Sequence, residues 1–341
     1  MYLFLRKLLF TLDAERAHEL SLKVLSLLNR SGLLRLFMPK RVEAPLTVMG
    51  IEFPNAVGLA AGLDKNAAHI DALAQCGFGF IEVGTVTPLA QPGNDRPRLF
   101  RLVQDEAIIN RMGFNNDGVD ELVEHVRNSR RDCVLGINIG KNRNTPLENA
   151  VDDYLACMQK VYALADYITI NISSPNTPGL RNLQHGEGLS ALLSALKGRQ
   201  AELASQQQRY VPLLVKIAPD LDDEAISDIA QRLLAVEIDG VIATNTTNSR
   251  PAGLQNRELA AEQGGLSGRP VFTLSTQVLA KLVAALDGSI PVIAVGGIFS
   301  AQDALEKVRA GASLVQIYTG FIYKGPRLVH DCARALALKQ H

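Results

Sequence analysis

Two lysines of this sequence could bind an anionic group. Lys216 lies inside the apolar run at residues 213–217, where burial of an unpaired charge would be costly. It could stabilise negative charge on a bound cofactor, or it could form a Schiff base after burial lowers its pKa. Lys65 follows the glycine-bearing stretch 60–64 and could bind a carboxylate, although a surface lysine after a glycine turn would have the same pattern.

Asparagines are concentrated at the ends of apolar runs and in the segments inserted between them. The side-chain amide offers a donor and an acceptor together, which suits a planar heterocycle with alternating N–H and C=O groups. Asparagine is also a common turn residue, so the inference depends on the whole set rather than on one member. The set consists of Asn110, Asn115, Asn138, Asn171, Asn176 and Asn245.

The candidate base is a serine. The histidines at 18, 69, 125, 185, 330 and 341 form no pair at metal-ligand spacing, so we expect no metal site. The sequence also contains neither a Gly-x-Ser-x-Gly elbow nor a Walker loop. Ser173 and Ser174 remain, on a loop that Pro175 and Pro178 restrict.

Two glycine-bearing turns predict a phosphate site. Gly296 and Gly297 follow the apolar run at residues 291–295, and Gly320 ends the stretch after the run at residues 312–318. Backbone N–H groups in such turns, next to helix starts, bind phosphate groups in many barrels. The alternative is that these glycines only allow tight turns.

Eight short apolar runs must position these groups. Their nearly continuous hydrophobicity indicates burial on both faces, and therefore a parallel sheet. Helical patterns such as those at residues 224–235, 273–286 and 300–310 alternate with them, which leaves an open doubly wound sheet or a closed barrel. The count of eight favours a (β/α)8 barrel, in which strand ends gather at one mouth. The runs are residues 56–60, 80–84, 134–138, 167–171, 213–217, 240–244, 291–295 and 312–318.

Three insertions interrupt the even spacing of the apolar runs, and we expect all of them at the mouth where the strands end. One lies between the second and third runs, one at residues 173–180, and one at residues 247–268. Long loops in a compact domain usually serve as lids or binding loops.

Residues 1–41 form a separate module with a net charge of +5, ahead of a catalytic barrel at residues 42–341. Leucines and phenylalanines recur in it at helical spacing, which predicts a basic amphipathic extension. Such helices can lie in a membrane interface, or they can pack only on the barrel wall. Because no run of about 18 apolar residues occurs, we expect no membrane-spanning helix.

The composition excludes several classes of protein. At 341 residues and 47% hydrophobic content, the chain can form one large barrel core. Lys plus Arg and Asp plus Glu are equal at 35 each, so nucleic acid is not an expected partner. The four cysteines form no Cys-x-x-Cys pair, which argues against a disulfide scaffold or a thiolate metal site.

Five motifs resemble the dihydroorotate dehydrogenase family. They are residues 58–65, 109–116, 171–180, 244–247 and 264–268, in the family's order and across almost the whole chain. The start at residues 13–18 looks like that of the membrane-associated, quinone-dependent class. Ser174 agrees with that class, since the cytosolic class has cysteine at this place.

The resemblance implies a function and a set of site residues. (S)-Dihydroorotate would be oxidised to orotate in pyrimidine biosynthesis, with FMN as the cofactor and Ser174 as the base that removes the C5 proton. FMN would contact Ala61, Gly62, Leu63, Asp64, Lys65, Thr85, Asn138, Asn171, Lys216, Thr244, Gly268, Gly297, Tyr318 and Thr319. The substrate would contact Lys65, Asn110, Arg111, Met112, Gly113, Phe114, Asn171, Asn176, Asn245 and Thr246.

The resemblance also implies an electron acceptor and a location. Reduced FMN would pass electrons to ubiquinone or another membrane quinone, in a tunnel with His18, Arg101 and Tyr318 near its inner end. We therefore expect a monomer that lies peripherally on the cytoplasmic face of the cell membrane. The residues alone leave two alternatives: a Schiff-base phosphosugar aldolase, and a non-catalytic nucleotide-binding peripheral membrane protein.

Overall fold

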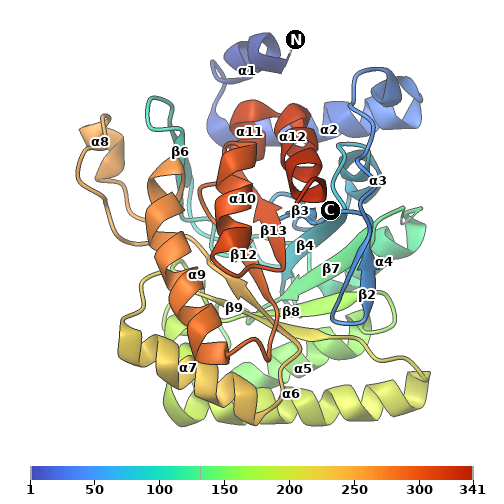
Figure 1. The fold of residues 1–341 in the computed structure, drawn as a ribbon, viewed down its shortest axis with the longest axis vertical. Coiled ribbons are helices and arrows are strands. Elements are labelled where there is room, and N and C mark those ends of the chain that lie inside the picture. The colour runs from blue at the N-terminus through green and yellow to red at the C-terminus, as the bar shows by residue number, and fades with distance from the viewer. Residues whose placement is uncertain (1, 131, 340–341) are drawn as a thin grey trace.

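The computed structural model describes residues 2–130 and 132–339, and its centre is a closed barrel of eight parallel strands (Figure 1). The strands pair in chain order, and the last one returns to the first. All eight predicted runs are confirmed as strands, and so is the (β/α)8 class. The strands are β3 (Val57–Leu59), β4 (Phe80–Val86), β7 (Val134–Ile139), β8 (Tyr167–Asn171), β9 (Leu213–Ile217), β10 (Gly240–Ala243), β12 (Val292–Val295) and β13 (Leu314–Ile317).

Helices between the strands form the outer layer, and polar residues mark where several of them begin. Asp222 accepts a hydrogen bond from the backbone N–H of Ala225 (2.8 Å), and Ser300 accepts one from that of Asp303 (3.2 Å). The three predicted helices are confirmed within one residue at each end. The layer comprises α3 (Ile70–Ala74), α4 (Val119–Asn128), α5 (Ala150–Val161), α6 (Gly186–Gln207), α7 (Asp223–Ala235), α9 (Phe272–Leu286), α10 (Ala301–Arg309), α11 (Thr319–Lys324) and α12 (Pro326–Ala337).

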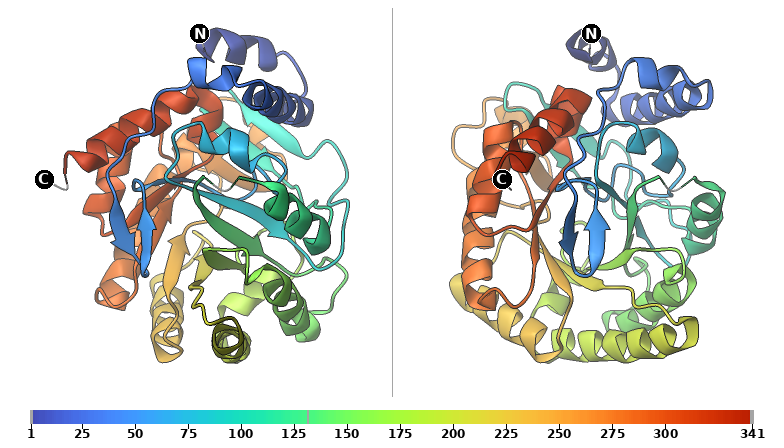
Figure 2. Two further views of the ribbon diagram at one scale, coloured as in Figure 1. Left: turned by 90° about the vertical axis from the view of Figure 1, so that its right-hand side faces the viewer. Right: turned by 45° about the vertical axis from the view of Figure 1, so that its right-hand side comes forward.

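A hairpin closes the amino end of the barrel. It consists of β1 (Leu46–Val48) and β2 (Ile51–Phe53), and Figure 2 shows it below the N-terminal helices. The Phe53 and Phe80 rings are 5.1 Å apart, at the first residue of β4. The sequence did not predict this hairpin, because its turn at Met49 and Gly50 uses two positive φ angles (56° and 73°) without the usual Asn-Gly signal.

A second small sheet, of three antiparallel strands, lies at the carboxyl end of the barrel. It contains β5 (Leu99–Leu102), β6 (Ala107–Asn110) and β11 (Gly265–Gly268), in the order β11-β6-β5. Two of the predicted insertions therefore meet there, since β5 and β6 come from the first and β11 from the third. Gly264 makes the close approach possible, because a Cβ on it would lie 2.3 Å from the Asn110 carbonyl oxygen.

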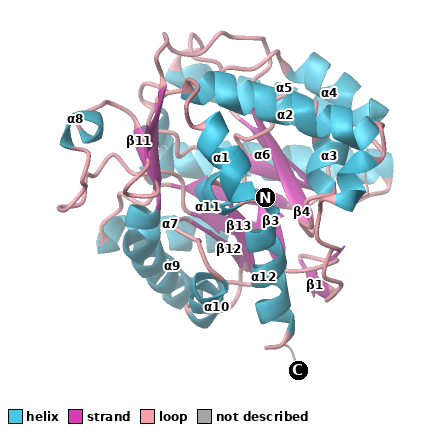
Figure 3. Ribbon diagram, turned by 90° about the horizontal axis from the view of Figure 1, so that it is seen from above, coloured by secondary structure: helices cyan, strands magenta, loops and turns pink. Residues whose placement is uncertain are grey.

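The N-terminal module is helical, as predicted, and lies at the mouth of the barrel. It contains α1 (Tyr2–Leu9) and α2 (Ala14–Arg30), and Figure 3 looks down on this end, where both helices are in view. The Tyr2 hydroxyl donates to the Ile322 carbonyl of α11 (2.6 Å). The division at residue 41 stays a prediction.

A buried ion pair fastens α2 to the mouth. The Arg98 guanidinium donates to both carboxylate oxygens of Glu15, with its shortest contact at 2.8 Å. The two side chains are only 6% and 9% exposed. Burial raises the pKa of Glu15, but the hydrogen bonds and charge of Arg98 outweigh this effect and hold the pKa below its usual value.

We predict that Arg98→Met lowers the free energy of unfolding by about 3–5 kcal/mol, because it leaves a buried carboxylate without its main partner. Urea denaturation followed by far-ultraviolet circular dichroism measures this loss. Arg96→Met is the matched control: Arg96 also contacts Glu15 (3.0 Å), but its side chain is 61% exposed, so the expected loss is below about 1 kcal/mol. Equal losses of unfolding free energy in the two variants would contradict the role of the buried Glu15–Arg98 pair in holding α2.

Candidate active site

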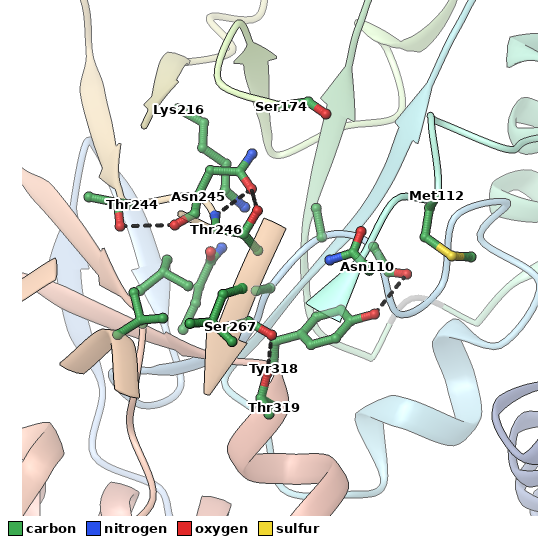
Figure 4. Close-up of a pocket in the computed structure, with 18 of the residues that line it drawn as sticks. Asn110, Met112, Ser174, Lys216, Thr244, Asn245, Thr246, Ser267, Tyr318 and Thr319 are labelled. Carbon is green, nitrogen blue, oxygen red and sulfur yellow. Dashed lines mark hydrogen bonds between the residues drawn. The ribbon is translucent and has the colours of Figure 1, made fainter. Parts of the chain in front are cut away.

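A cleft of about 1060 Å³, open to solvent, lies at the carboxyl ends of the barrel strands (Figure 4). Nineteen of the residues named as the base or as FMN or substrate contacts line it, although they come from segments far apart in the chain. They are Ala61, Gly62, Lys65, Thr85, Asn110, Met112, Gly113, Phe114, Asn171, Ser174, Asn176, Lys216, Thr244, Asn245, Thr246, Gly268, Gly297, Tyr318 and Thr319.

Four of the named site residues do not line the cleft: Leu63, Asp64, Asn138 and Arg111. The Asp64 carboxylate accepts from the backbone N–H groups of Ala68 (3.0 Å) and His69 (2.8 Å), so it shapes the loop after β3. Arg111 pairs with Glu262 at 2.6 Å. Asn115, one of the six asparagines, does not line the cleft either.

The two glycine-bearing turns form one wall of the cleft. Gly297 has a φ of 76°, and a Cβ on it would lie 2.4 Å from the Cα of Phe272. At the second turn, the Thr319 hydroxyl donates to the hydroxyl of Ser267 on β11 (2.8 Å; Figure 4). The backbone N–H groups of Gly297 and Ile298 have no hydrogen-bond acceptor among the described residues. The wall therefore presents free donors that suit an anionic group.

Below the cleft, buried polar side chains connect several strands. Glu82 is fully buried and accepts from Asn138 Nδ2 (2.8 Å), Gln316 Nε2 (2.7 Å) and the Tyr167 hydroxyl (3.1 Å). Asn138 Oδ1 in turn accepts from the Thr85 hydroxyl (2.6 Å). Because Glu82 holds the amide nitrogen of Asn138, it fixes which way that amide faces.

The same chain of hydrogen bonds continues upward to the cleft. Asn171 Nδ2 donates to the Thr85 hydroxyl (2.8 Å), and Asn171 Oδ1 accepts from the Ser173 hydroxyl (3.0 Å). Asn245 Nδ2 then donates to Ser173 Oγ (2.9 Å). Three of the six asparagines thus belong to one network, which orients the amides that face the cleft.

The side chain of Lys216 has no hydrogen bond or ion pair with any described residue, although only 5% of the residue is exposed. Burial lowers its pKa, and the charge of Glu82 opposes this effect. Figure 4 shows its side chain directed toward the cleft beside Asn245. An unpartnered buried cation at this place suits a ligand with a negatively charged edge.

Lys65 is the second cation of the cleft. Burial lowers its pKa to about 8, while the charge of Glu15 on α2 opposes the shift. Lys65 also makes no hydrogen bond to the described residues. The cleft therefore offers a carboxylate-bearing ligand one cation at the mouth, separate from the one on β9.

The serine loop is held to the rim by a side chain that the sequence did not single out. Arg181 donates to the Ser173 carbonyl (3.0 Å) and to the Thr246 carbonyl (2.9 Å), and it pairs with Asp220 (2.8 Å). Ser174 Oγ accepts from the Asn176 backbone N–H (3.2 Å) and lines the cleft. Ser174, rather than Ser173, is therefore the serine whose hydroxyl is free to act on a ligand.

Sequence reasoning also missed Glu82, Gln316 and Ser267. Glu82 and Gln316 are polar residues inside the apolar runs at residues 80–84 and 312–318, which is the signal that identified Lys216. The same reasoning would have found them. Ser267 had no such signal, because its strand β11 has the sequence Gly-Leu-Ser-Gly, which is not an apolar run.

Two of the residues assigned to the quinone end adjoin the N-terminal helices. Arg101 donates to the Leu9 carbonyl (3.2 Å) and to that of Leu12, and its guanidinium lies 4.6 Å from the centre of the Phe10 ring. His18 is half-buried on α2, and burial lowers its pKa to about 3, so it is neutral near pH 7. Tyr318 lines the cleft.

The barrel and the cleft define a (β/α)8-barrel enzyme with its functional groups at the strand ends. A family model described as dihydroorotate dehydrogenase matches residues 44–339, and the chain belongs to this family. The family is a flavin-dependent one, which removes the aldolase alternative.

Similar proteins and solved structures support the same family membership. Proteins described as dihydroorotate dehydrogenase (quinone) from Idiomarina loihiensis and Chromobacterium violaceum are 63% and 61% identical; the alignments cover 97% and 99% of this chain and 98% of each relative. A crystal structure of the Eimeria tenella enzyme in complex with ferulenol has a TM-score of 0.87 at 39% identity, covering 96% of this chain and 92% of the other. Its ligand-free form has a TM-score of 0.85 at 41% identity, covering 94% and 95%.

We predict that Glu82→Gln lowers the free energy of unfolding by about 1–3 kcal/mol, since one amide oxygen then faces three buried donors. Thr169→Val is the control, because the Thr169 hydroxyl is buried without a partner and its removal leaves stability unchanged or higher. Urea denaturation of both variants tests the difference. A Glu82→Gln protein as stable as Thr169→Val would contradict the role of the network.

Proposed function

We propose that this chain oxidises (S)-dihydroorotate to orotate in pyrimidine biosynthesis and passes the electrons to a membrane quinone. The main observation in support is that Ser174, Lys65 and the unpartnered Lys216 line one cleft. The relatives of this chain are described as quinone dihydroorotate dehydrogenases. The non-catalytic alternative leaves these groups without a role.

FMN is the flavin that we propose for the cleft. Two features support this choice: the free N–H groups beside Gly297, which suit a phosphate, and Lys216, which suits the ring edge that gains negative charge. A bound flavin supplies a two-electron acceptor. Thr85, Asn171 and Thr244 would bind the ring from the strand ends, and Asn138 would act from below by orienting Thr85.

The other proposed cofactor residues divide into two groups. Ala61, Gly62, Lys65, Gly268, Tyr318 and Thr319 line the cleft and would contact FMN. Leu63 and Asp64 would contribute through their loop, since their side chains lie outside the cleft.

The substrate would lie on the side of the cleft that carries Ser174. Lys65 would bind its carboxylate, and the amides would bind its ring. Ser174 Oγ would remove the C5 proton while the hydride leaves C6, so that orotate forms with its new double bond. Thr177, which is buried on the same loop, or a water chain would carry the proton outward. The ring contacts would come from Asn110, Met112, Gly113, Phe114, Asn171, Asn176, Asn245 and Thr246, with Arg111 supporting the loop.

We predict that Ser174→Ala retains its flavin but reduces it with dihydroorotate about 10²–10⁴-fold more slowly, because the proton acceptor is lost. Anaerobic stopped-flow absorbance measures this rate, and the visible spectrum checks flavin content. A variant that reduces its flavin at the wild-type rate would refute the role of Ser174.

The N-terminal module supports peripheral attachment to a membrane. Eleven of the fifteen large apolar side chains exposed by the described residues lie between Leu3 and Phe37. The net charge of +5 in residues 1–41 adds attraction to anionic lipid. We therefore place the protein on the cytoplasmic face of the cell membrane, where ubiquinone or another quinone would reach the cleft past α1 and α2. A monomer remains our prediction.

Within residues 2–130 and 132–339, no helix is both long and apolar enough to cross a membrane.

We predict that replacing Phe4, Leu27 and Leu36 together by serine lowers binding to anionic vesicles at least tenfold, because these side chains are 80%, 67% and 76% exposed and would enter the lipid. Vesicle pelleting measures the loss, and flavin reduction by dihydroorotate should stay unchanged. The control replaces Leu89 and Leu338, each 72% exposed but outside the module. Equal losses of binding in the two variants would refute the membrane role of the module.

A further inference from the structure

Lys307 is a buried cation that the reaction described above does not use. It lies on α10 and is fully buried, yet no described carboxylate forms an ion pair with it. Its Nζ donates to Ser275 Oγ (2.6 Å) and lies 4.8 Å from the centre of the Phe272 ring. Burial lowers its pKa to about 7, against the opposing charges of Glu306 and Asp303. A buried ammonium group destabilises the folded protein unless hydrogen bonds or a nearby negative charge compensate for its lost hydration.

Ser275 connects this cation to the glycine turn of the cleft wall. An ammonium group can only donate, so the Ser275 hydroxyl accepts from Lys307 and turns its own proton elsewhere. Two carbonyl oxygens lie within reach of it, those of Gly296 (3.2 Å) and Phe272 (3.1 Å). The contact with Gly296 is close, since a Cβ on that glycine would lie 2.7 Å from Ser275 Oγ.

The direction of the Gly296 carbonyl determines where the next N–H group points. The peptide bond between Gly296 and Gly297 is trans, so its C=O and N–H groups point in opposite directions. With the carbonyl turned toward Ser275, the N–H of Gly297 points away from α9, on the side of the cleft. This N–H has no acceptor among the described residues, and Gly297 lines the cleft.

We infer that Lys307 is a positioning residue for the phosphate of the cofactor, acting through Ser275 and the Gly296–Gly297 peptide. Its charge polarises the Ser275 hydroxyl and, through it, the peptide whose N–H would bind the phosphate. The phosphate is also the anion that compensates for the buried ammonium from the far side of the turn. This inference rests on the proposed function, because it takes the phosphate to be that of FMN.

Riboflavin distinguishes a phosphate role from a structural one, since it has the same ring system without the phosphate. The full-length protein, depleted of flavin, would be titrated with FMN and with riboflavin while flavin fluorescence is followed. We expect Lys307→Met to weaken FMN binding at least tenfold and to change riboflavin binding less than twofold. Lys281→Met, an exposed lysine on α9 that pairs with Asp223, should change neither.

Ser275→Ala provides a second variant that removes only the connecting hydroxyl. Ser275→Ala should weaken FMN binding more than riboflavin binding, by a smaller factor than Lys307→Met. This result would support the inference even if Lys307→Met did not fold. Equal losses for FMN and riboflavin, or unchanged FMN binding, in the variants that fold would overturn it. Wild-type protein that binds neither flavin would instead overturn the proposed function.

Discussion

A closed barrel of eight parallel strands excludes water from its interior, so every polar side chain placed there needs a partner. In this protein Glu82 meets much of that requirement in the lower interior, since it accepts three hydrogen bonds from three other strands, while the Thr169 hydroxyl and Gln316 Oε1 stay without a partner. Lys216, one level higher, has no partner among the described residues. Glu82 therefore has its hydrogen-bond partners within the protein, whereas a ligand would supply the partner of Lys216. Lys307 is a second buried cation without an ion pair among the described residues, but it donates to Ser275 behind the Gly296–Gly297 turn.

The mouth is built from parts that also connect the site to the N-terminal module. The Glu15–Arg98 pair holds α2 against the insertion after β4, and the charge of Glu15 acts on Lys65 in the cleft. Arg101 donates to the carbonyl of Leu9, the last residue of α1, and to that of Leu12, which lies between α1 and α2. These contacts connect the N-terminal helices to the same end of the barrel as the cleft, where we propose that the electron acceptor enters.

The strands and the two glycine turns could be predicted from the sequence, because apolar runs and glycine turns are local signals, whereas most of the other residues that line the cleft were named only through the resemblance to the family's motifs. Lys216 is recognisable as a charge inside such a run, and Glu82 and Gln316 are polar residues inside two other runs. The mouth sheet could not be predicted in this way, since β11 pairs with β6 across more than 150 residues of chain. Arg181 was equally hidden, because its role depends on the Ser173 and Thr246 carbonyls, which only the folded chain brings together.

The most direct test of the account is the visible absorbance spectrum of the purified protein, recorded without oxygen. The account predicts a flavin spectrum that bleaches when dihydroorotate is added and returns when a quinone analogue follows. A colourless protein that stays inert after FMN is supplied, or a flavin that dihydroorotate does not reduce, would contradict it.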